Sequence, residues 1–337
     1  MKRKLINSSQ VVHAAICLLW LAGTLAVSAA TEEKINRRFS VHPDGTLVVE
    51  VDFGSLDIST NATSEVVVDV WRKIGRSKKA DEEAFLRDNP VTFSQDGDTV
   101  TIRAQHDSKV TQSWFSRVRN QNEAKYTITV PAQFNASLRT GGGGIAVADL
   151  TGETKAHTGG GGLSLSRLHG PIEGNTGGGG IHAADCSGAI KLNTGGGGVE
   201  VIGGSGSLNA RTGGGGVTVR RFDGVADLKT GGGGIALENV TGKVEGSTGG
   251  GGIDLVLPTE LAETVNVSTA GGGISVRVPE TTAFNLDAHT SGGGVTSELP
   301  VTSPGKPVPG RLEGPVNGGG KAVVLRSGGG NIHLKKL

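Results

Sequence analysis

Apolar side chains recur along the middle of this chain at two spacings, of two residues and of 18 residues. An aliphatic residue follows each of a series of glycine runs, and a second one comes two positions later. The first of these positions holds Ile145, Leu163, Ile181, Val199, Val217, Ile235 and Ile253. Because a period of two places side chains on one face of a β-strand, each unit is predicted to contain a strand with one buried face.

The other half of each unit carries a second pair of apolar positions with the same spacing. Its first position holds Thr154, Ile172, Ile190, Leu208, Ala226 and Val244, and its second holds Ala156, Gly174, Leu192, Ala210, Leu228 and Gly246. Each unit therefore predicts two short strands, one in each half.

The first corner between these strands is a Thr followed by four Gly. It recurs from Thr140 to Thr248 in steps of 18 residues, and Thr269 and Thr290 continue it, each followed by three Gly after one other residue, in steps of 21. The Thr shares the parity of the apolar positions. We therefore expect it to point inward, with its hydroxyl bonded to a neighbouring unit.

The second corner contains a Gly in each unit, where we expect positive φ or a close approach between units. These residues are Gly152, Gly170, Gly188, Gly206, Gly224 and Gly242. Asn317 and Ser327 are expected to open two last, degenerate units.

A unit this short cannot bury its own apolar face and must stack on its neighbours. The sequence therefore predicts an all-β protein, a parallel β-helix or β-solenoid with coils of 18–21 residues. Composition agrees, because 58 Gly and only 4% aromatic residues suit a narrow core of aligned aliphatic side chains.

The flanking regions lack the regular corner. Strand-like runs over 46–51, 65–71, 91–94, 99–104 and 125–130, with a short helix over 81–87, predict a less regular β cap at the N-terminal end. Residues 303–317 are expected to form a loop, and a final strand over 331–335 is expected to close the rod. The predicted organisation is a signal peptide over 1–30, the cap over 31–135 and the solenoid over 136–337.

The N-terminus has the pattern of a secretory signal peptide. Lys2, Arg3 and Lys4 precede an apolar stretch, and Ser28-Ala29-Ala30 offers small residues for cleavage before Thr31. Retention of this stretch as a membrane anchor is the alternative. With cleavage, we expect no transmembrane segment and a location in the periplasm, on the outer cell surface or outside the cell.

Charge and cysteine content narrow the possible partners. The signal peptide holds three of the 33 Lys and Arg residues and none of the 32 acidic ones, so the mature chain carries a net charge of −2. That balance argues against nucleic acid as a partner. Cys186 is the one Cys of the mature chain and falls in a column of core residues, so stability must come from packing and repetition.

No catalytic, cofactor-binding or metal-binding residues are predicted. The glycine runs match a dinucleotide-binding motif trivially, without the strand–loop–helix context that gives the motif meaning. Asp149 and Asp185 share a column with Arg167 and Arg221, which fits either a small site of a carbohydrate-active β-helix enzyme or solvated residues beside a corner. We expect the protein not to be an enzyme.

One segment offers a candidate binding site for a partner. The polar stretch over 106–125 carries Trp114 and Phe115 with Arg117 and Arg119 nearby, a combination that can grip a glycan or a protein. Packing as a lid over the first coils is the alternative.

The chain resembles the bacterial family of adhesin-type β-strand-repeat proteins, of the DUF4097 type. The features that carry the resemblance are Gly45-Thr-Leu-Val-Val-Glu-Val, Gly54-Ser-Leu-Asp-Ile, Tyr126-Thr-Ile-Thr-Val-Pro131, the Thr-Gly-Gly-Gly-Gly-Ile units and Leu325-Arg-Ser-Gly-Gly-Gly-Asn-Ile-His-Leu334. Four Gly at most corners is a departure, since relatives more often have Ser-Gly or Gly-Ser there. The resemblance implies a β-helix at the cell envelope and carries over no catalytic residues.

These observations predict a non-catalytic, adhesin-like envelope protein that binds an unknown protein or glycan. A carbohydrate-active enzyme and a sensor or regulatory partner of envelope-stress systems are the alternatives.

Overall fold

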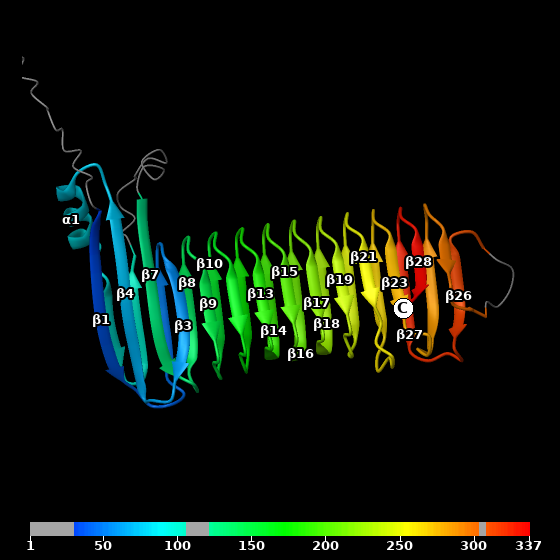
Figure 1. The fold of residues 1–337 in the computed structure, drawn as a ribbon, viewed down its shortest axis with the longest axis horizontal. Helices are drawn as coiled ribbons and strands as arrows, with labels where there is room; N and C mark the ends of the chain where they lie inside the picture. Colours follow the sequence, from blue (N-terminus) through cyan, green and yellow to red (C-terminus); the bar gives the residue numbers. More distant parts are fainter. Residues whose placement is uncertain (1–29, 106–120, 303–307) are drawn as a thin grey trace, which may run out of the picture.

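The computed structural model describes residues 30–105, 121–302 and 308–337. Within them the chain forms two 14-stranded sheets that pack face to face along a straight, flattened rod (Figure 1). Each coil of the repeat adds one strand to each sheet, which confirms the predicted all-β solenoid.

In the repeats, neighbouring strands of each sheet are parallel and aligned residue for residue. The first sheet contains β9 (Ile145–Ala148), β11 (Leu163–Ser166), β13 (Ile181–Ala184), β15 (Val199–Ile202), β17 (Val217–Arg220), β19 (Ile235–Glu238), β21 (Ile253–Val256) and β23 (Ile274–Val278). The second contains β8 (Asn135–Thr140), β10 (Thr154–Thr158), β12 (Ile172–Thr176), β14 (Ser187–Thr194), β16 (Ser205–Thr212), β18 (Asp223–Thr230), β20 (Val244–Thr248) and β22 (Val265–Thr269). Ile145 lies opposite Leu163, which lies opposite Ile181, so the predicted columns are confirmed.

The core is the slot between the two sheets, filled by the predicted aliphatic columns. Leu192 and Leu228 are fully buried, with the smaller Ala210 between them. At Gly174 an added Cβ would lie 3.0 Å from Leu192 Cδ2 and 3.1 Å from Leu163 Cδ1. Large and small residues in one column therefore complement each other, which keeps a thin core dense.

The Thr of the first corner points inward, as predicted, and joins successive coils. Thr194 Oγ1 donates to the carbonyl oxygen of Gly179 at 2.7 Å and accepts from the backbone N–H of Gly197 at 3.2 Å. The same pair of bonds recurs at Thr158, Thr176, Thr212, Thr230 and Thr248. Each buried hydroxyl thus satisfies one carbonyl and one N–H that the sharp corner takes out of the sheets.

The second corner contains a backbone that turns through the left-handed region. Gly152, Gly170, Gly188, Gly206 and Gly224 have φ between 112° and 142°. A Cβ on Gly170 would also lie 2.6 Å from the carbonyl oxygen of Gly152 in the preceding coil. Gly242 does not have positive φ, but a Cβ on it would lie 2.1 Å from the carbonyl oxygen of Gly224. Close approach is therefore confirmed at this corner throughout, and positive φ at every predicted glycine except Gly242.

The N-terminal cap continues both sheets with strands that the sequence only partly predicts. Its elements are β1 (Thr31–Ser40), β2 (Thr46–Val51), β3 (Ser55–Asn61), β4 (Glu65–Gly75), α1 (Lys79–Asp88), β5 (Thr92–Asp96), β6 (Thr99–Ala104) and β7 (Gln121–Pro131). The coil formed by β2 and β3 lies between the first repeat and the coil formed by β6 and β7. Beyond that outer coil, β4 and β1 extend the first sheet antiparallel, β5 extends the second, and Phe39 stacks on Phe93 across the slot at 6.4 Å between ring centroids.

The C-terminal end differs from the prediction in three ways. The last coil, β27 (Ala322–Ser327) and β28 (Ile332–Lys336), lies between the β22–β23 coil and the coil of β24 (Phe284–Thr290) and β25 (Val295–Ser297), so the final strand does not close the rod. Within the segment expected to be a loop, β26 (Arg311–Val316) pairs antiparallel with β24 at the end of the second sheet. Asn317 turns the chain between β26 and β27 and donates to the carbonyl oxygens of Glu280 and Thr282, rather than opening a coil.

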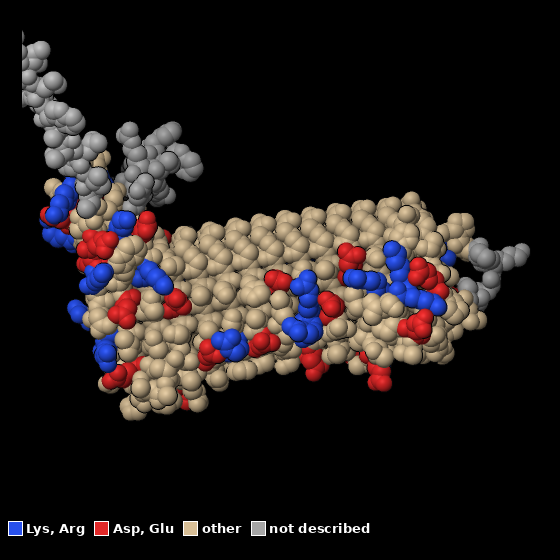
Figure 2. All heavy atoms as spheres, viewed as in Figure 1, with Lys and Arg blue, Asp and Glu red and all other residues tan. Residues whose placement is uncertain are grey.

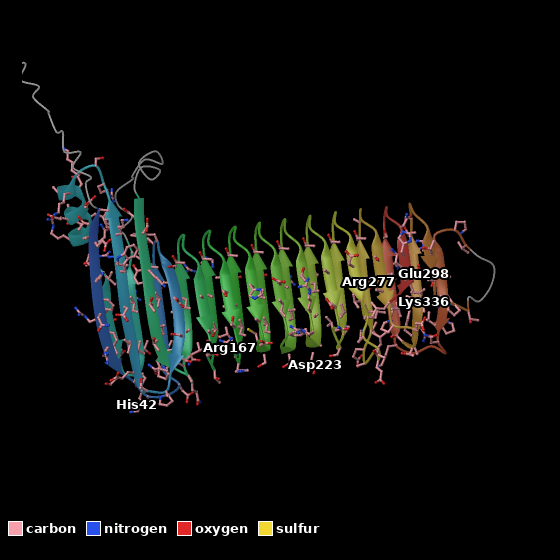
Figure 3. The ribbon with its side chains drawn as sticks, in the orientation of Figure 1. His42, Arg167, Asp223, Arg277, Glu298 and Lys336 are labelled. Atoms are coloured by element: carbon pink, nitrogen blue, oxygen red, sulfur yellow. The ribbon has the colours of Figure 1, made fainter. Side chains whose placement is uncertain are left out.

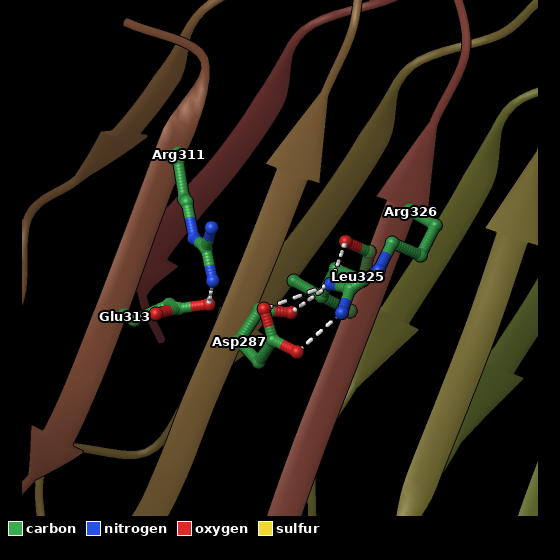
Figure 4. Close-up of polar contacts among 5 residues, drawn as sticks. All are labelled: Asp287, Arg311, Glu313, Leu325 and Arg326. Carbon is green, nitrogen blue, oxygen red and sulfur yellow. Dashed lines mark hydrogen bonds and ion pairs between the residues drawn. The ribbon is translucent and has the colours of Figure 1, made fainter. Parts of the chain in front are cut away.

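Ser327 does open a coil, as predicted. Its hydroxyl donates to the carbonyl oxygen of Gly272 at 2.9 Å and accepts from Gly330 N–H at 2.9 Å, so it reproduces the Thr corner. Beside it, the guanidinium of Arg326 on β27 holds both carboxylate oxygens of Asp287 on β24, which lowers the pKa of Asp287 (Figure 4). These contacts fix the last coil in its internal position.

Candidate binding site on the N-terminal cap

The outer face of the first sheet changes character where the repeat ends. On the cap, β1, β4 and β7 lie side by side, and their register places Trp71 between Lys34 and Lys125 in one row. The next row places Asp69 between Asn36 and Thr127. Residues of alternating parity on β4, such as Val70, point inward and are buried. The strand pairing alone therefore brings an aromatic ring, two ammonium groups and an amide–carboxylate pair onto one exposed face.

These side chains line a hollow of about 260 Å³. The Trp71 Nε1–H donates to Glu32 Oε2 at 3.2 Å, and Asn36 Nδ2 donates to Asp69 Oδ1 at 2.6 Å. At the other side, Lys125 Nζ lies 3.7 Å from Asp57 Oδ2 on β3. The half-buried indole is thus held in place by its polar edge, and the rim around it alternates donors with acceptors.

The charges at this site are mixed, because Lys34 and Lys125 lie among Glu32, Asp57 and Asp69. Figure 2 shows the same interspersed blue and red groups over the cap, compared with the largely uncharged upper part of the rod. A near-neutral rim does not favour a strongly charged ligand of either sign. An aromatic face with hydrogen-bonding groups around it is suited to a neutral ligand rich in hydroxyl groups.

The floor beneath the hollow is unusually polar for this core. Arg72, next to Trp71 but facing inward, is 1% exposed, and its Nε donates to Glu33 Oε2 at 2.7 Å while its Nη1 donates to the Asn89 carbonyl oxygen at 2.8 Å. Tyr126 on β7 is fully buried, and this burial raises the pKa of its hydroxyl to about 12. Loss of Glu33 would leave the buried guanidinium of Arg72 without its charged partner, which is costly, so this pair helps to hold β1 and β4 in register.

The sequence-based candidates Trp114, Phe115, Arg117 and Arg119 lie outside the described residues, in the segment 106–120 that leads into β7. Their role stays a prediction. Trp71 was not singled out from the sequence, although a signal was present. In the alternating run 65–71 it occupies an outward position, where an aromatic residue has no core to fill.

The column of Asp149, Arg167, Asp185 and Arg221 lies at the second corner, along the lower margin of the rod where Figure 3 labels Arg167. Arg167 Nη2 donates to Asp149 Oδ2 at 2.8 Å, and this bonded guanidinium lowers the pKa of Asp149. The coil of Gly203 separates Asp185 from Arg221. Arg167 and Asp149 therefore form an exposed ion pair between adjacent coils. A carboxylate held ionised in this way is a poor general acid, so the pair does not have the character of a catalytic site.

A second hollow, of about 540 Å³, lies over the first sheet in the middle of the rod. Its lining combines glycine residues and three aliphatic strand residues with His182, Glu200 and Thr218. His182 Nδ1 lies 3.2 Å from Glu200 Oε2. This shallow surface carries no Phe, Tyr or Trp side chain among its described lining residues. Within the part of the chain that the structure covers, no group of three His, Cys, Asp or Glu side chains is placed to hold a metal ion.

Comparison with solved structures finds similar chains at low identity. They include a candidate adhesin of Bacteroides fragilis (15% identity, covering 91% of this chain and 99% of that one, TM-score 0.32). A candidate lipid-binding protein of Parabacteroides distasonis is also similar (11%, 91% and 98%, TM-score 0.38), as is a candidate adhesin of the same species (12%, 90% and 97%, TM-score 0.36). No curated protein matches the sequence. The Toastrack DUF4097 family model matches residues 47–335, from β2 to the last strand, and the chain therefore belongs to the Toastrack DUF4097 family.

Proposed function

We propose that this protein is a non-catalytic, exported component of the cell envelope that binds a glycan through the outer face of its N-terminal cap, in the manner of an adhesin. The hollow around Trp71 carries this proposal. It combines an indole ring with donors and acceptors spaced along two rows of a rigid sheet, and sugars present both hydroxyl groups and apolar ring faces to such surfaces.

The partners of the carboxylates around the hollow favour binding over hydrolysis. Glu32 accepts from Trp71, Asp69 accepts from Asn36, and Asp57 lies beside Lys125. A glycoside hydrolase instead needs two carboxyl groups that face each other across the scissile bond. Carboxylates whose oxygens are engaged by neighbouring donors are better suited to orienting sugar hydroxyls.

Export is supported by the signal-peptide pattern before Thr31. In the described part of the chain, no helix has the length and apolar character that crossing a membrane requires. We infer that the mature rod acts in the periplasm, at the outer surface or outside the cell, where its repeats serve as a spacer that presents the cap.

The test is a glycan array probed with the mature chain, followed by titration of the best ligand with the wild type and with Trp71→Ala. Trp71→Ala should weaken binding at least about tenfold, as expected for an aromatic anchor, with an unchanged melting temperature. His182→Ala, in the mid-rod hollow, is the matched control and should bind as the wild type does.

A paired variant, Trp114→Ala with Phe115→Ala, separates a role of the cap hollow from a role of the sequence-predicted segment 106–120. Full binding by Trp71→Ala combined with loss of binding in this paired variant would reject the hollow as the site. Retention of binding by both Trp71→Ala and the paired variant would reject the cap as the binding site.

A further inference from the structure

A buried carboxylate joins three elements of the cap at one point. Glu82, in the first turn of α1, is 1% exposed. Its Oε2 accepts from the backbone N–H of Thr31 at 3.0 Å and from the Thr31 hydroxyl at 2.6 Å, and its Oε1 accepts from the backbone N–H of Arg76 at 2.8 Å. The start of β1, the end of β4 and α1 therefore meet on this side chain.

This carboxylate is ionised but has neutral donors around it. The hydrogen bond from the Thr31 hydroxyl and the one from the Arg76 N–H lower the pKa of Glu82 below its ordinary value. Among the ion pairs within 4 Å that the described residues form, none includes Glu82. Lys79 on α1 also lowers the pKa of Glu82, as the smallest of these causes, but its ammonium group lies within 4 Å of Glu83 rather than of Glu82. A buried carboxylate with no cation in direct contact is costly, so a positive charge on one of its present donors would stabilise it.

Thr31 is the residue that follows the expected cleavage site Ser28-Ala29-Ala30. Hydrolysis of the Ala30–Thr31 bond by an envelope peptidase consumes one water, leaves a carboxylate on Ala30 and an amine on Thr31, and this amine is protonated at neutral pH. The Thr31 nitrogen already lies 3.0 Å from Glu82 Oε2. Cleavage would therefore place a positive charge in direct contact with Glu82, the one carboxylate that is buried among the described residues.

We propose that Glu82 is a built-in receptor for the new N-terminus, so that removal of the signal peptide locks β1 onto α1 and β4. This inference rests on the export part of the proposed function and is independent of the glycan. The ion pair replaces an amide hydrogen bond by a charge-assisted one, which is the stronger kind. The cap of the processed chain is therefore more stable than the cap of the precursor.

The test compares two purified chains, one that begins at Thr31 with a free amine and one that keeps Ala29 and Ala30 before it. Every described strand and α1 lie within 31–337, so both chains contain the whole fold. The free amine should raise the equilibrium constant for folding about tenfold, in line with a hydrogen bond that gains charge. The pKa of the Thr31 amine, followed by NMR, should be higher by about one unit than in an unfolded chain.

The direction of the pH dependence is fixed by this raised pKa. The stability advantage should be complete below about pH 7.5, where the amine is charged in both states, for as long as Glu82 stays ionised, and it should disappear as the pH rises through the folded-state pKa of the amine. Glu82→Gln should abolish the difference between the two chains. Asp81→Asn, an exposed acid on the same turn, should preserve it.

Equal stability of the two chains, or an equal difference with Glu82→Gln, would overturn the proposal. So would a first residue other than Thr31 in the full-length protein recovered from an envelope fraction. If the recovered chain starts at Thr31 and shows the stability difference but binds no glycan, only the proposed ligand is lost.

Discussion

At the scale of single residues, the four glycines of a corner differ in how much space each leaves for a side chain. In the coil after Thr158, a Cβ on Gly159 would lie 2.3 Å from the carbonyl oxygen of Gly141, and one on Gly161 would lie 2.1 Å from that of Gly143. A Cβ on Gly160 would meet nothing within 4 Å, and its backbone lies outside the left-handed region. The first and third glycines are therefore required by the backbone of the preceding coil, while the second faces open space.

This difference predicts opposite effects for two neighbouring substitutions. Gly161→Ala should destabilise the protein by about 2–3 kcal/mol or more, because a backbone carbonyl cannot move aside as a flexible side chain can. Gly160→Ala should be neutral or stabilising by up to about 1 kcal/mol, because alanine restricts the unfolded chain. Urea unfolding of both variants measures the effect, and equal losses would contradict this account of the corner.

At the scale of elements, the position of the last coil decides how the C-terminal end is held. β27 has β22 on one side and β24 on the other, and Val323 and Leu325 on it are fully buried. β26, which precedes it in the chain, forms the edge of the second sheet, and Leu312 on β26 is only partly buried. Chain order and spatial order are therefore exchanged at this end.

Truncation of Leu325 and of Leu312 should cost different amounts of stability, because Leu325 lies in an internal coil and Leu312 at the edge. Leu325→Ala removes a side chain from an internal coil and should cost about 3 kcal/mol, within the range for buried leucines. Leu312→Ala, at the edge, should cost about 1 kcal/mol, because part of the side chain already contacts water. Chemical denaturation gives both values. A larger loss for Leu312→Ala than for Leu325→Ala would contradict the assignment of β26 to the edge of the second sheet and of β27 to its interior.

The sequence predicted the elements far better than their order. Every 18-residue column was readable, because period-two burial and the corner Thr and Gly are local properties. The position of β27 and β28 between two earlier coils could not be predicted from the sequence. Leu325 and Ile332 fit the same apolar columns whichever coils lie beside them. β1 was missed since Glu33 and Arg37 occupy positions of inward parity on either side of Ile35, at an edge where burial is partial. The Trp71 hollow depends on antiparallel pairing of β1, β4 and β7, which nothing local in those strands specifies.

At the scale of the whole molecule, the rod is a stack in which each middle coil contacts only its two neighbours. The stability of such a stack is approximately a sum of coil terms and interface terms. The Thr-Gly-Gly-Gly-Gly corners lie along one margin of the rod, and the second corners, whose backbone has positive φ, lie along the other (Figure 1). Successive coils therefore superpose by simple translation.

Removal of a complete coil should therefore be tolerated. Deletion of residues 195–212 joins Thr194 to the next Gly corner in the same phase, and we expect a folded rod shorter by one strand spacing, about 4.8 Å. Deletion of residues 195–203 removes half a coil, puts each following strand into the wrong sheet and should prevent cooperative folding. Small-angle scattering and thermal melting distinguish these outcomes, and a folded half-coil variant would refute the stacking rule.

At both ends of the rod the spatial order of the coils differs from their order in the chain, so each end is fully packed only after a later segment has been synthesised. The β2–β3 coil is covered only after β6 and β7 have been made, and the gap between the β22–β23 and β24–β25 coils is filled only by the last strands of the chain. A polypeptide that emerges N-terminus first can build its middle at once, but it cannot close the gap at the other end until β27 and β28 have emerged. A prematurely terminated product would keep an open apolar slot beside Val267 and Val276, where quality-control proteases can recognise it.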